Sequence, residues 1–135
     1  MWLKKYNQMK KILISRTDGI GDAMLTLPMT GYLKEQFPGV EIFFLGKNYT
    51  RPMVECCSNI DHFLSWDVLG AKDFDEQVDD IRDLELDAVI HVFPNKEVAK
   101  AMKAANVPIR IGTSHRIFHL LTCNKLVHFS RKNSP

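Results

Sequence analysis

The 135-residue chain has few cysteines and no long hydrophobic run. Its three cysteines include the adjacent pair Cys56 and Cys57, and none has the CxxC or Cys/His spacing of a zinc site. This usage fits a reducing compartment better than a disulfide framework. We interpret the adjacent pair as packing residues rather than nucleophiles. The longest apolar stretches, such as residues 12–14 and 88–90, are too short to span a membrane.

Several signals of targeting and of ligand binding are also missing. The basic start of the chain is not followed by the apolar segment and small-residue cleavage site of a secretory signal, so we expect a cytoplasmic protein. The GxGxxG and GK[ST] motifs of dinucleotide and Walker-type binding do not occur. Basic stripes interleaved with aromatic residues are absent too, so no nucleic-acid partner is expected. No metal is suggested.

Charge is distributed unevenly along the chain. Residues 61–87 carry ten acidic and two basic side chains, whereas residues 88–135 carry one acidic and eight basic ones. One interpretation is a solvated acidic helix between two basic segments. The other is that the basic segments converge in space on an anionic ligand. The charge pattern alone does not choose between them.

Short apolar runs alternate with helical periodicity. Strands are predicted over residues 11–15, 40–45, 62–66, 87–93, 108–111 and 125–129. Helices are predicted over residues 22–37, 49–57, 73–85, 96–105 and 114–122, with Asn95 as the cap of the fourth. Such alternation indicates right-handed βαβ units. We therefore expect an α/β protein with a doubly wound, Rossmann-like and mostly parallel sheet.

Periodicity also predicts which helix faces are buried. In the helix over 22–37 the apolar face consists of Leu25, Met29, Tyr32, Leu33 and Phe37. Pro28 is expected to interrupt this helix, so that its first turn is either separate or kinked and Pro28 lies near the start of the longer part. In the acidic helix over 73–85 the apolar face consists of Phe74, Val78, Ile81 and Leu84.

The predicted topology also indicates where a ligand would bind. Open parallel sheets bind ligands beyond the carboxyl ends of their strands, at a switch in strand order. Loops at that rim carry four cations, which are Arg16, Lys47, Lys96 and Arg116. Their common location favours an anionic ligand, such as one bearing phosphate.

The loop over residues 16–22, with the sequence RTDGIGD, is the most informative segment. Its two glycines permit close backbone approach, and the helix that follows points free N–H groups at the rim. Asp22 is either a helix cap or a general base placed at the rim. His91, inside an apolar strand, is either a histidine of the core or a catalytic group.

Residues 10–46 resemble the amino-terminal segment of glycosyltransferase family 9, which includes the lipopolysaccharide heptosyltransferases. The shared pattern is a strand, an arginine, a loop ending in Gly-Asp and a Leu-Thr-x-Pro segment. Here it reads Arg16, Asp18, Ile20-Gly21-Asp22 and Leu25-Thr26-Leu27-Pro28. Residues 87–112 look like the fourth strand of the family, its helix and an Arg-Ile-Gly strand. His91 departs from the pattern, because many relatives carry an acid there.

The resemblance implies one half of a GT-B fold, in which two Rossmann-like domains face each other across a cleft. It implies inverting transfer of heptose, or a related sugar, from an ADP-sugar to an acidic or phosphorylated lipopolysaccharide-core acceptor, without a cofactor or metal. Asp22 would be the catalytic base, since a carboxylate can deprotonate the attacking hydroxyl. The acceptor would contact the rim residues Arg16, Thr17, Asp18, Gly19, Gly21, Lys47, Asn95, Lys96 and Arg116.

Family members are more than twice as long as this chain. We therefore expect residues 1–9 to be an extension, residues 10–130 to form the acceptor-binding domain, and residues 131–135 to lead toward an absent donor-binding domain. The chain alone is expected to be inactive. Its predicted partners are the nucleotide-sugar, the lipopolysaccharide-core acceptor and, peripherally, the inner face of the membrane.

Two other classes compete with this interpretation. A non-enzymatic, receiver-like domain for a small anionic ligand would need a phosphorylatable Asp and a Lys after particular strands. The sequence has Phe93-Pro94-Asn95 and Gly112-Thr113-Ser114 there. A nucleotide-binding oxidoreductase domain would need a third glycine and a ribose-binding acid, which are missing.

Overall fold

The computed structural model describes residues 9–113 and 125–127. Six strands in this part of the chain form one sheet, namely β1 (Lys11–Ser15), β2 (Glu41–Gly46), β3 (His62–Ser65), β4 (Ala88–His91), β5 (Ile109–Thr113) and β6 (Lys125–Val127). Their order is β3-β2-β1-β4-β5-β6, and all neighbours are parallel. The predicted α/β fold with a parallel sheet is thereby confirmed.

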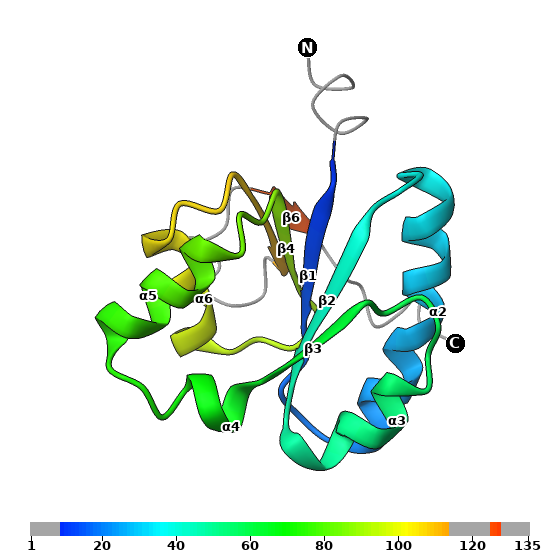
Figure 1. The fold of residues 1–135 in the computed structure, drawn as a ribbon, viewed down its shortest axis with the longest axis horizontal. Coiled ribbons are helices and arrows are strands. Elements are labelled where there is room, and N and C mark those ends of the chain that lie inside the picture. Colours follow the sequence, from blue (N-terminus) through cyan, green and yellow to red (C-terminus); the bar gives the residue numbers. More distant parts are fainter. Residues whose placement is uncertain (1–8, 114–124, 128–135) are drawn as a thin grey trace.

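Helices cover both faces of this sheet (Figure 1). They are α2 (Ile20–Gln36), η1 (Asn48–Thr50), α3 (Arg51–Glu55), α4 (Trp66–Leu69), α5 (Phe74–Asp83) and α6 (Lys96–Ala104). Successive strand residues point to opposite faces, so each strand contributes to two cores. In β1, Leu13 packs in the core under α5 and α6, whereas Ile12 and Ile14 pack in the core under α2 and α3.

Helix α2 differs from the prediction at its start and at Pro28. It begins at Ile20, two residues earlier than expected, and continues through Pro28 as one helix. The alternative of a separate first turn is therefore wrong. Proline lacks an N–H and would leave a carbonyl of the preceding turn unbonded. The affected carbonyl is that of Met24, while the hydroxyl of Thr26 donates one turn earlier, to the carbonyl oxygen of Asp22.

The predicted buried face of α2 is also partly wrong. Leu25 and Tyr32 are 79% and 61% exposed. The residues of α2 that are buried are Ala23, Thr26, Thr30 and Leu33. Threonine can be buried here because its hydroxyl bonds within the helix, as Thr30 does to the carbonyl of Leu27 at 2.6 Å.

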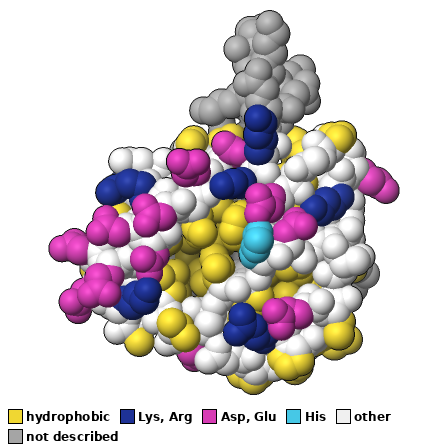
Figure 2. Space-filling model, in the orientation of Figure 1, with side chains coloured by type: hydrophobic (Ala, Val, Ile, Leu, Met, Phe, Trp, Pro, Cys, Tyr) yellow, Lys and Arg dark blue, Asp and Glu magenta, His cyan; other side chains and the backbone are white. Residues whose placement is uncertain are grey.

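Helix α5 keeps two of its predicted core residues, Val78 and Ile81, which are buried. Phe74 was expected in the core and is 48% exposed, while Gln77 is buried instead. The amide of Gln77 donates to the carbonyl oxygen of Lys72 at 2.9 Å, which offsets the cost of burying it. The acidic side chains gather over α5 on the molecular surface (Figure 2).

Two further elements complete the comparison with the prediction. Helix α4 was missed, because residue 66 was assigned to the preceding strand. Its cap is Ser65, whose hydroxyl accepts a hydrogen bond from the backbone N–H of Val68. The helix expected over 114–122 lies outside the described residues. Within residues 9–113, no helix is both long and apolar enough to cross a bilayer.

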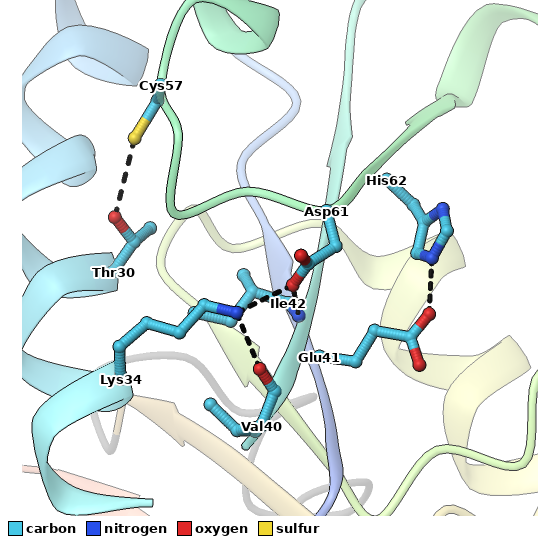
Figure 3. A network of polar contacts seen from close by, with 8 residues as sticks. All are labelled: Thr30, Lys34, Val40, Glu41, Ile42, Cys57, Asp61 and His62. Carbon is cyan, nitrogen blue, oxygen red and sulfur yellow. Dashed lines mark hydrogen bonds and ion pairs between the residues drawn. The ribbon is translucent and has the colours of Figure 1, made fainter. Parts of the chain in front are cut away.

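Hydrogen bonds among Lys34, Val40, Ile42 and Asp61, called the polar clasp below, connect α2 to the amino ends of β2 and β3 (Figure 3). Lys34 Nζ donates to the carbonyl oxygen of Val40 at 2.6 Å and to the carboxylate of Asp61 at 2.8 Å. The same carboxylate accepts the N–H of Ile42 at 2.8 Å. Nearby, His62 pairs with Glu41. The clasp lies at the opposite end of the strands from the predicted rim.

Candidate functional site

The strand order reverses between β1 and β4, so the loops after these strands flank the switch point. Backbone hydrogen bonds draw the two loops together, since the N–H groups of Val92 and Phe93 both donate to the carbonyl oxygen of Ser15. The side-chain amide of Asn95 donates to the hydroxyl of Thr17 at 2.9 Å. One continuous rim therefore joins the carboxyl ends of the two central strands.

Asn95 is held in this position by the helix that it caps. Its side-chain oxygen accepts hydrogen bonds from the N–H groups of Glu97 and Val98, at 3.1 and 3.2 Å. The predicted cap is thereby confirmed. Because the side-chain oxygen of Asn95 bonds to α6, its amide nitrogen points toward Thr17.

The loop between β1 and α2 brings three charged side chains together. Arg16 Nη2 lies 3.2 Å from Asp18 Oδ2 and 3.3 Å from Asp22 Oδ1. The side chains of Arg16 and Asp18 are each 16% exposed, whereas that of Asp22 is 54% exposed. Asp22 is therefore the carboxylate of this cluster that a ligand reaches most readily.

Asp22 does not cap α2. The capping position is Gly19, which has an extended backbone and no side-chain hydrogen bond to the helix. Its carbonyl oxygen accepts the N–H of Ala23 at 3.0 Å. Asp22 lies in the first turn instead, where a carboxylate interacts favourably with the positive end of the helix. The capping alternative is therefore wrong, and the role of Asp22 as a base stays a prediction.

Asp18 occupies the inner part of the same loop. Burial raises the pKa of its carboxyl above the ordinary value, the charge of Arg16 opposes this shift, and the nearby Asp22 adds to it. The Asp18 Oδ1 atom is shielded from solvent and has no hydrogen-bond partner among the described residues. The phenol of Tyr49 donates to the carbonyl oxygen of Asp18 at 3.1 Å, which ties this loop to the loop after β2.

Gly46 ends β2 directly beside this loop. A Cβ atom there would lie 2.9 Å from Phe44 Cε1 and 3.3 Å from the carbonyl oxygen of Arg16. Only glycine therefore lets the two chain segments approach this closely. The N–H of Arg16 uses this approach to donate to the carbonyl oxygen of Leu45 at 3.0 Å.

The remaining predicted rim residues are spread more widely. Lys47 Nζ lies 3.7 Å from the carboxylate of Asp67, at the start of α4, and Lys96 is exposed at the start of α6. Gly21 lies in the exposed first turn of α2. Arg116 lies outside the described residues. The structure thus gathers the loop over 16–22 with Asn95, while the lysines stand on neighbouring loops.

Two residues of this region were missed by the sequence analysis, namely Tyr49 and Asp67. Their contacts depend on which loops become neighbours in space, and no local spacing signals them. His91 is buried and lies beside Ser15 in the register between β4 and β1. This burial agrees with a histidine of the core.

The chain is similar to known glycosyltransferases. No family model matches it. Over 119 residues it is 29% identical to a putative glycosyltransferase from Haemophilus influenzae. The aligned part makes up 87% of this chain and 34% of that protein. Among solved structures, a family 9 glycosyl transferase from Veillonella parvula is 22% identical with a TM-score of 0.71, over 92% of this chain and 37% of that one. The E. coli ADP-heptose lps heptosyltransferase II is 16% identical with a TM-score of 0.77, over 92% and 36%.

The predicted resemblance to a glycosyltransferase is confirmed by the curated relative. The chain spans about a third of the length of its curated relative. The solved family 9 structure and the heptosyltransferase each align with 92% of this chain and share the fold described above.

Two surface hollows lie elsewhere, along the edge strand β3. One of about 330 Å³ is lined by apolar residues, which include Phe63, Leu64 and Ile81, and by the charged Lys72 and Asp80. Another of about 530 Å³ adjoins the residues of the polar clasp. Neither is lined by residues of the loop over 16–22 or by Asn95. The candidate rim at the switch point is therefore separate from both hollows.

Proposed function

We propose that the chain is the acceptor-binding half of an inverting glycosyltransferase, with Asp22 as its catalytic base. The observation that carries this proposal is the position of Asp22. It is an exposed carboxylate in the first turn of α2, beside the switch point of a sheet whose structural relatives include a family 9 glycosyltransferase. The complete enzyme would be a GT-B protein made of two doubly wound domains.

In the proposed reaction, an acceptor hydroxyl is held against Asp22. The carboxylate takes the hydroxyl proton as the oxygen attacks the anomeric carbon of the donor sugar. The new bond forms on the face opposite the leaving group, and the nucleoside diphosphate departs with the electron pair of the broken bond. Arg16 positions Asp22 through its contact at 3.3 Å.

The proposed donor is an ADP-sugar such as ADP-heptose, and the proposed acceptor is a sugar of a lipopolysaccharide core. We assign acceptor binding to residues 10–130, preceded by the extension over 1–9. Residues 131–135 would lead to the donor-binding domain. The fold described here comprises a single sheet with its helices, so the 135 residues alone are expected to bind acceptor and not to transfer sugar. The predicted cytoplasmic, membrane-peripheral location suits a lipid-linked acceptor.

The test is Asp22→Asn in the complete enzyme. Transfer should fall by about 10²–10⁴-fold, because the general base is lost while the shape of the side chain is kept. The far-UV circular dichroism and the KM for acceptor should change little. Asp79→Asn on α5 removes the same charge from a side chain that is 71% exposed and should leave transfer unchanged. Full activity of Asp22→Asn would exclude Asp22 as the base.

A binding experiment separates this proposal from its competitors. The purified chain should bind acceptor sugars at the rim and bind ADP weakly. Tight ADP binding would favour a nucleotide-binding domain instead. Sugar transfer by the 135-residue chain alone would contradict its assignment as half of an enzyme.

A further inference from the structure

Tyr49, in the short helix η1 after β2, has its hydroxyl bonded to the protein while its ring faces solvent. The phenol donates to the carbonyl oxygen of Asp18 at 3.1 Å, yet the residue is 58% exposed, which one oxygen atom is too small to account for. A surface tyrosine ordinarily does the opposite, because it packs its apolar ring and turns its hydroxyl toward water. We infer that the ring of Tyr49 is a binding platform for the apolar face of the acceptor sugar. This inference rests on the proposed function and adds a residue to the acceptor site.

The backbone on both sides of Tyr49 is fixed by hydrogen bonds. The N–H of Asn48 donates to the carboxylate of Asp67 at 2.7 Å. Thr50 is fully buried, and its N–H and its hydroxyl both donate to the carbonyl oxygen of Lys47, at 3.0 and 2.7 Å. The ring is therefore held at its backbone and at its hydroxyl before a ligand arrives. Such preorganisation lowers the entropic cost of binding, and it distinguishes Tyr49 from a side chain that moves freely on the surface.

Short contacts connect Tyr49 to the proposed base. Asp18, which accepts its hydrogen bond, precedes Gly19, and a Cβ atom on Gly19 would lie 3.9 Å from Asp22 Oδ2. With standard peptide dimensions, the Tyr49 hydroxyl and the Asp22 carboxylate are therefore no more than about 11 Å apart. That is the scale of one or two sugar rings. A sugar that offers a hydroxyl to Asp22 lies within reach of Tyr49.

The chemistry of a pyranose suits this pair of groups. Its hydroxyls point outward around the edge of the ring, and its C–H bonds form an apolar face. Packing that face on Tyr49 removes both surfaces from water, and the negative face of the aromatic ring attracts the C–H groups. The hydroxyls at the edge stay free to bond the exposed carboxylate of Asp22. Together the two contacts orient the attacking hydroxyl toward its base.

The first experiment titrates the folded 135-residue chain with core oligosaccharide released from lipopolysaccharide and, separately, with ADP. The amide signals of Gly19 and Gly21 report on the acceptor site. The ring signals of ¹³C-labelled tyrosine report on Tyr49, whose own signals are identified by their loss in Tyr49→Phe. The oligosaccharide should shift both sets of signals with the same Kd. A Tyr49 ring that shifts with ADP and not with the oligosaccharide would overturn the inference, because a nucleobase would then be the group that stacks on it.

Three variants test the ring itself. Tyr49→Ala should weaken binding of the oligosaccharide at least about fivefold, because the ring contact is lost. Tyr49→Phe keeps the ring and loses only the hydrogen bond to Asp18, so its affinity should stay close to that of the wild type. Tyr32→Ala is the matched control and should leave binding unchanged. It removes a tyrosine that is 61% exposed on α2, about 15 Å along the helix from Asp22.

The outcomes separate the platform from other roles. Equal losses in Tyr49→Ala and Tyr49→Phe would mean that the hydroxyl positions the loop and that the ring is no platform. Unchanged binding in Tyr49→Ala would also overturn the inference, and both results leave the proposed function standing. If the oligosaccharide shifts neither Gly19 nor Gly21 in the folded wild-type chain, the acceptor site itself fails, and the proposed function and this inference fall together.

Discussion

Thr17 and Asn95 are 78 residues apart in the chain, yet the hydroxyl of one and the side-chain amide of the other are 2.9 Å apart. This hydrogen bond joins the loops that follow the two central strands. The same side chain of Asn95 also caps α6. One residue therefore fixes both the start of a helix and the shape of the rim.

Asn95→Ala should lower the free energy of unfolding by about 1–2 kcal/mol, because the N–H groups of Glu97 and Val98 lose their acceptor. Asn95→Asp keeps an oxygen for the cap and loses only the donor to Thr17, so its loss should be smaller. Urea unfolding measures both. Asn48→Ala changes an exposed asparagine and serves as the control. Equal losses for Asn95→Ala and Asn95→Asp would show that the cap contributes little.

Two glycine substitutions should have opposite effects on stability. In Gly46→Ala the new methyl group would lie 2.9 Å from Phe44 Cε1 and 3.3 Å from the Arg16 carbonyl, so we expect a loss of about 1–3 kcal/mol. In Gly21→Ala the methyl group meets nothing within 4 Å, and a gain of about 0.5–1 kcal/mol is expected from helix propensity. Thermal unfolding of both variants tests this contrast. A stable Gly46→Ala protein would contradict the close approach of the loop to β2.

The orientation of α2 can be tested with a matched pair of leucines. Leu33 is 6% exposed, and Leu33→Ala should cost about 2–5 kcal/mol through lost burial and a cavity. Leu25 is 79% exposed, and Leu25→Ala should change stability by no more than about 0.5 kcal/mol. Denaturant midpoints provide the measurement. The reverse order of effects would mean that α2 is rotated about its axis relative to the structure.

The polar clasp makes the stability of the protein depend on pH. Burial alone would raise the pKa of Asp61, but the hydrogen bonds from Lys34 and Ile42 and the positive charges of Lys34 and His62 outweigh it and hold the pKa below its ordinary value. A carboxylate whose pKa is lowered by folding stabilises the native state above its unfolded pKa. This contribution is lost as the pH falls through the folded pKa.

Asp61→Asn should therefore be less stable than the wild type at neutral pH, and the difference should shrink as the pH falls below about 4. Unfolding in urea at a series of pH values measures this. The exposed Asp79 supplies the control, since Asp79→Asn removes a charge without breaking the clasp. A difference between Asp61→Asn and the wild type that did not change with pH would mean that the carboxylate charge is not what stabilises the clasp.

The elements with the strongest local signals could be predicted from the sequence. The strand over 11–15 is a short apolar run, and Asn95 caps a helix that begins at the next residue. Helix α2 shows where local patterns fail. Its buried threonines satisfy their own hydroxyls, so polar residues face the sheet while Leu25 and Tyr32 face solvent. Hydrophobic periodicity cannot detect that polar residues of α2 are buried while apolar ones are exposed.

The candidate site was likewise predictable in position and not in detail. Topology places the loop over 16–22 and Asn95 at the same edge of the sheet. The pairing of Arg16 with Asp18 and Asp22 depends on how three side chains turn within one short loop. The contact from Tyr49 depends on the path of another loop altogether. The rim was predicted as cationic, whereas in the structure two of its four predicted cations, Arg16 and Lys47, lie beside carboxylates.

The reversal of strand order means that β1 is synthesised well before its neighbour β4. β1 lies at the centre of the sheet and pairs with β4, and the backbone N–H of Lys11 bonds to a side chain 76 residues later. A ribosome releases β1, β2 and β3 well before β4 emerges. Until then, one edge of the buried central strand β1 has no partner to bond. Such an unpaired apolar edge is a template for association with other chains. The nascent protein is therefore expected to depend on chaperone protection until its fourth strand has been synthesised.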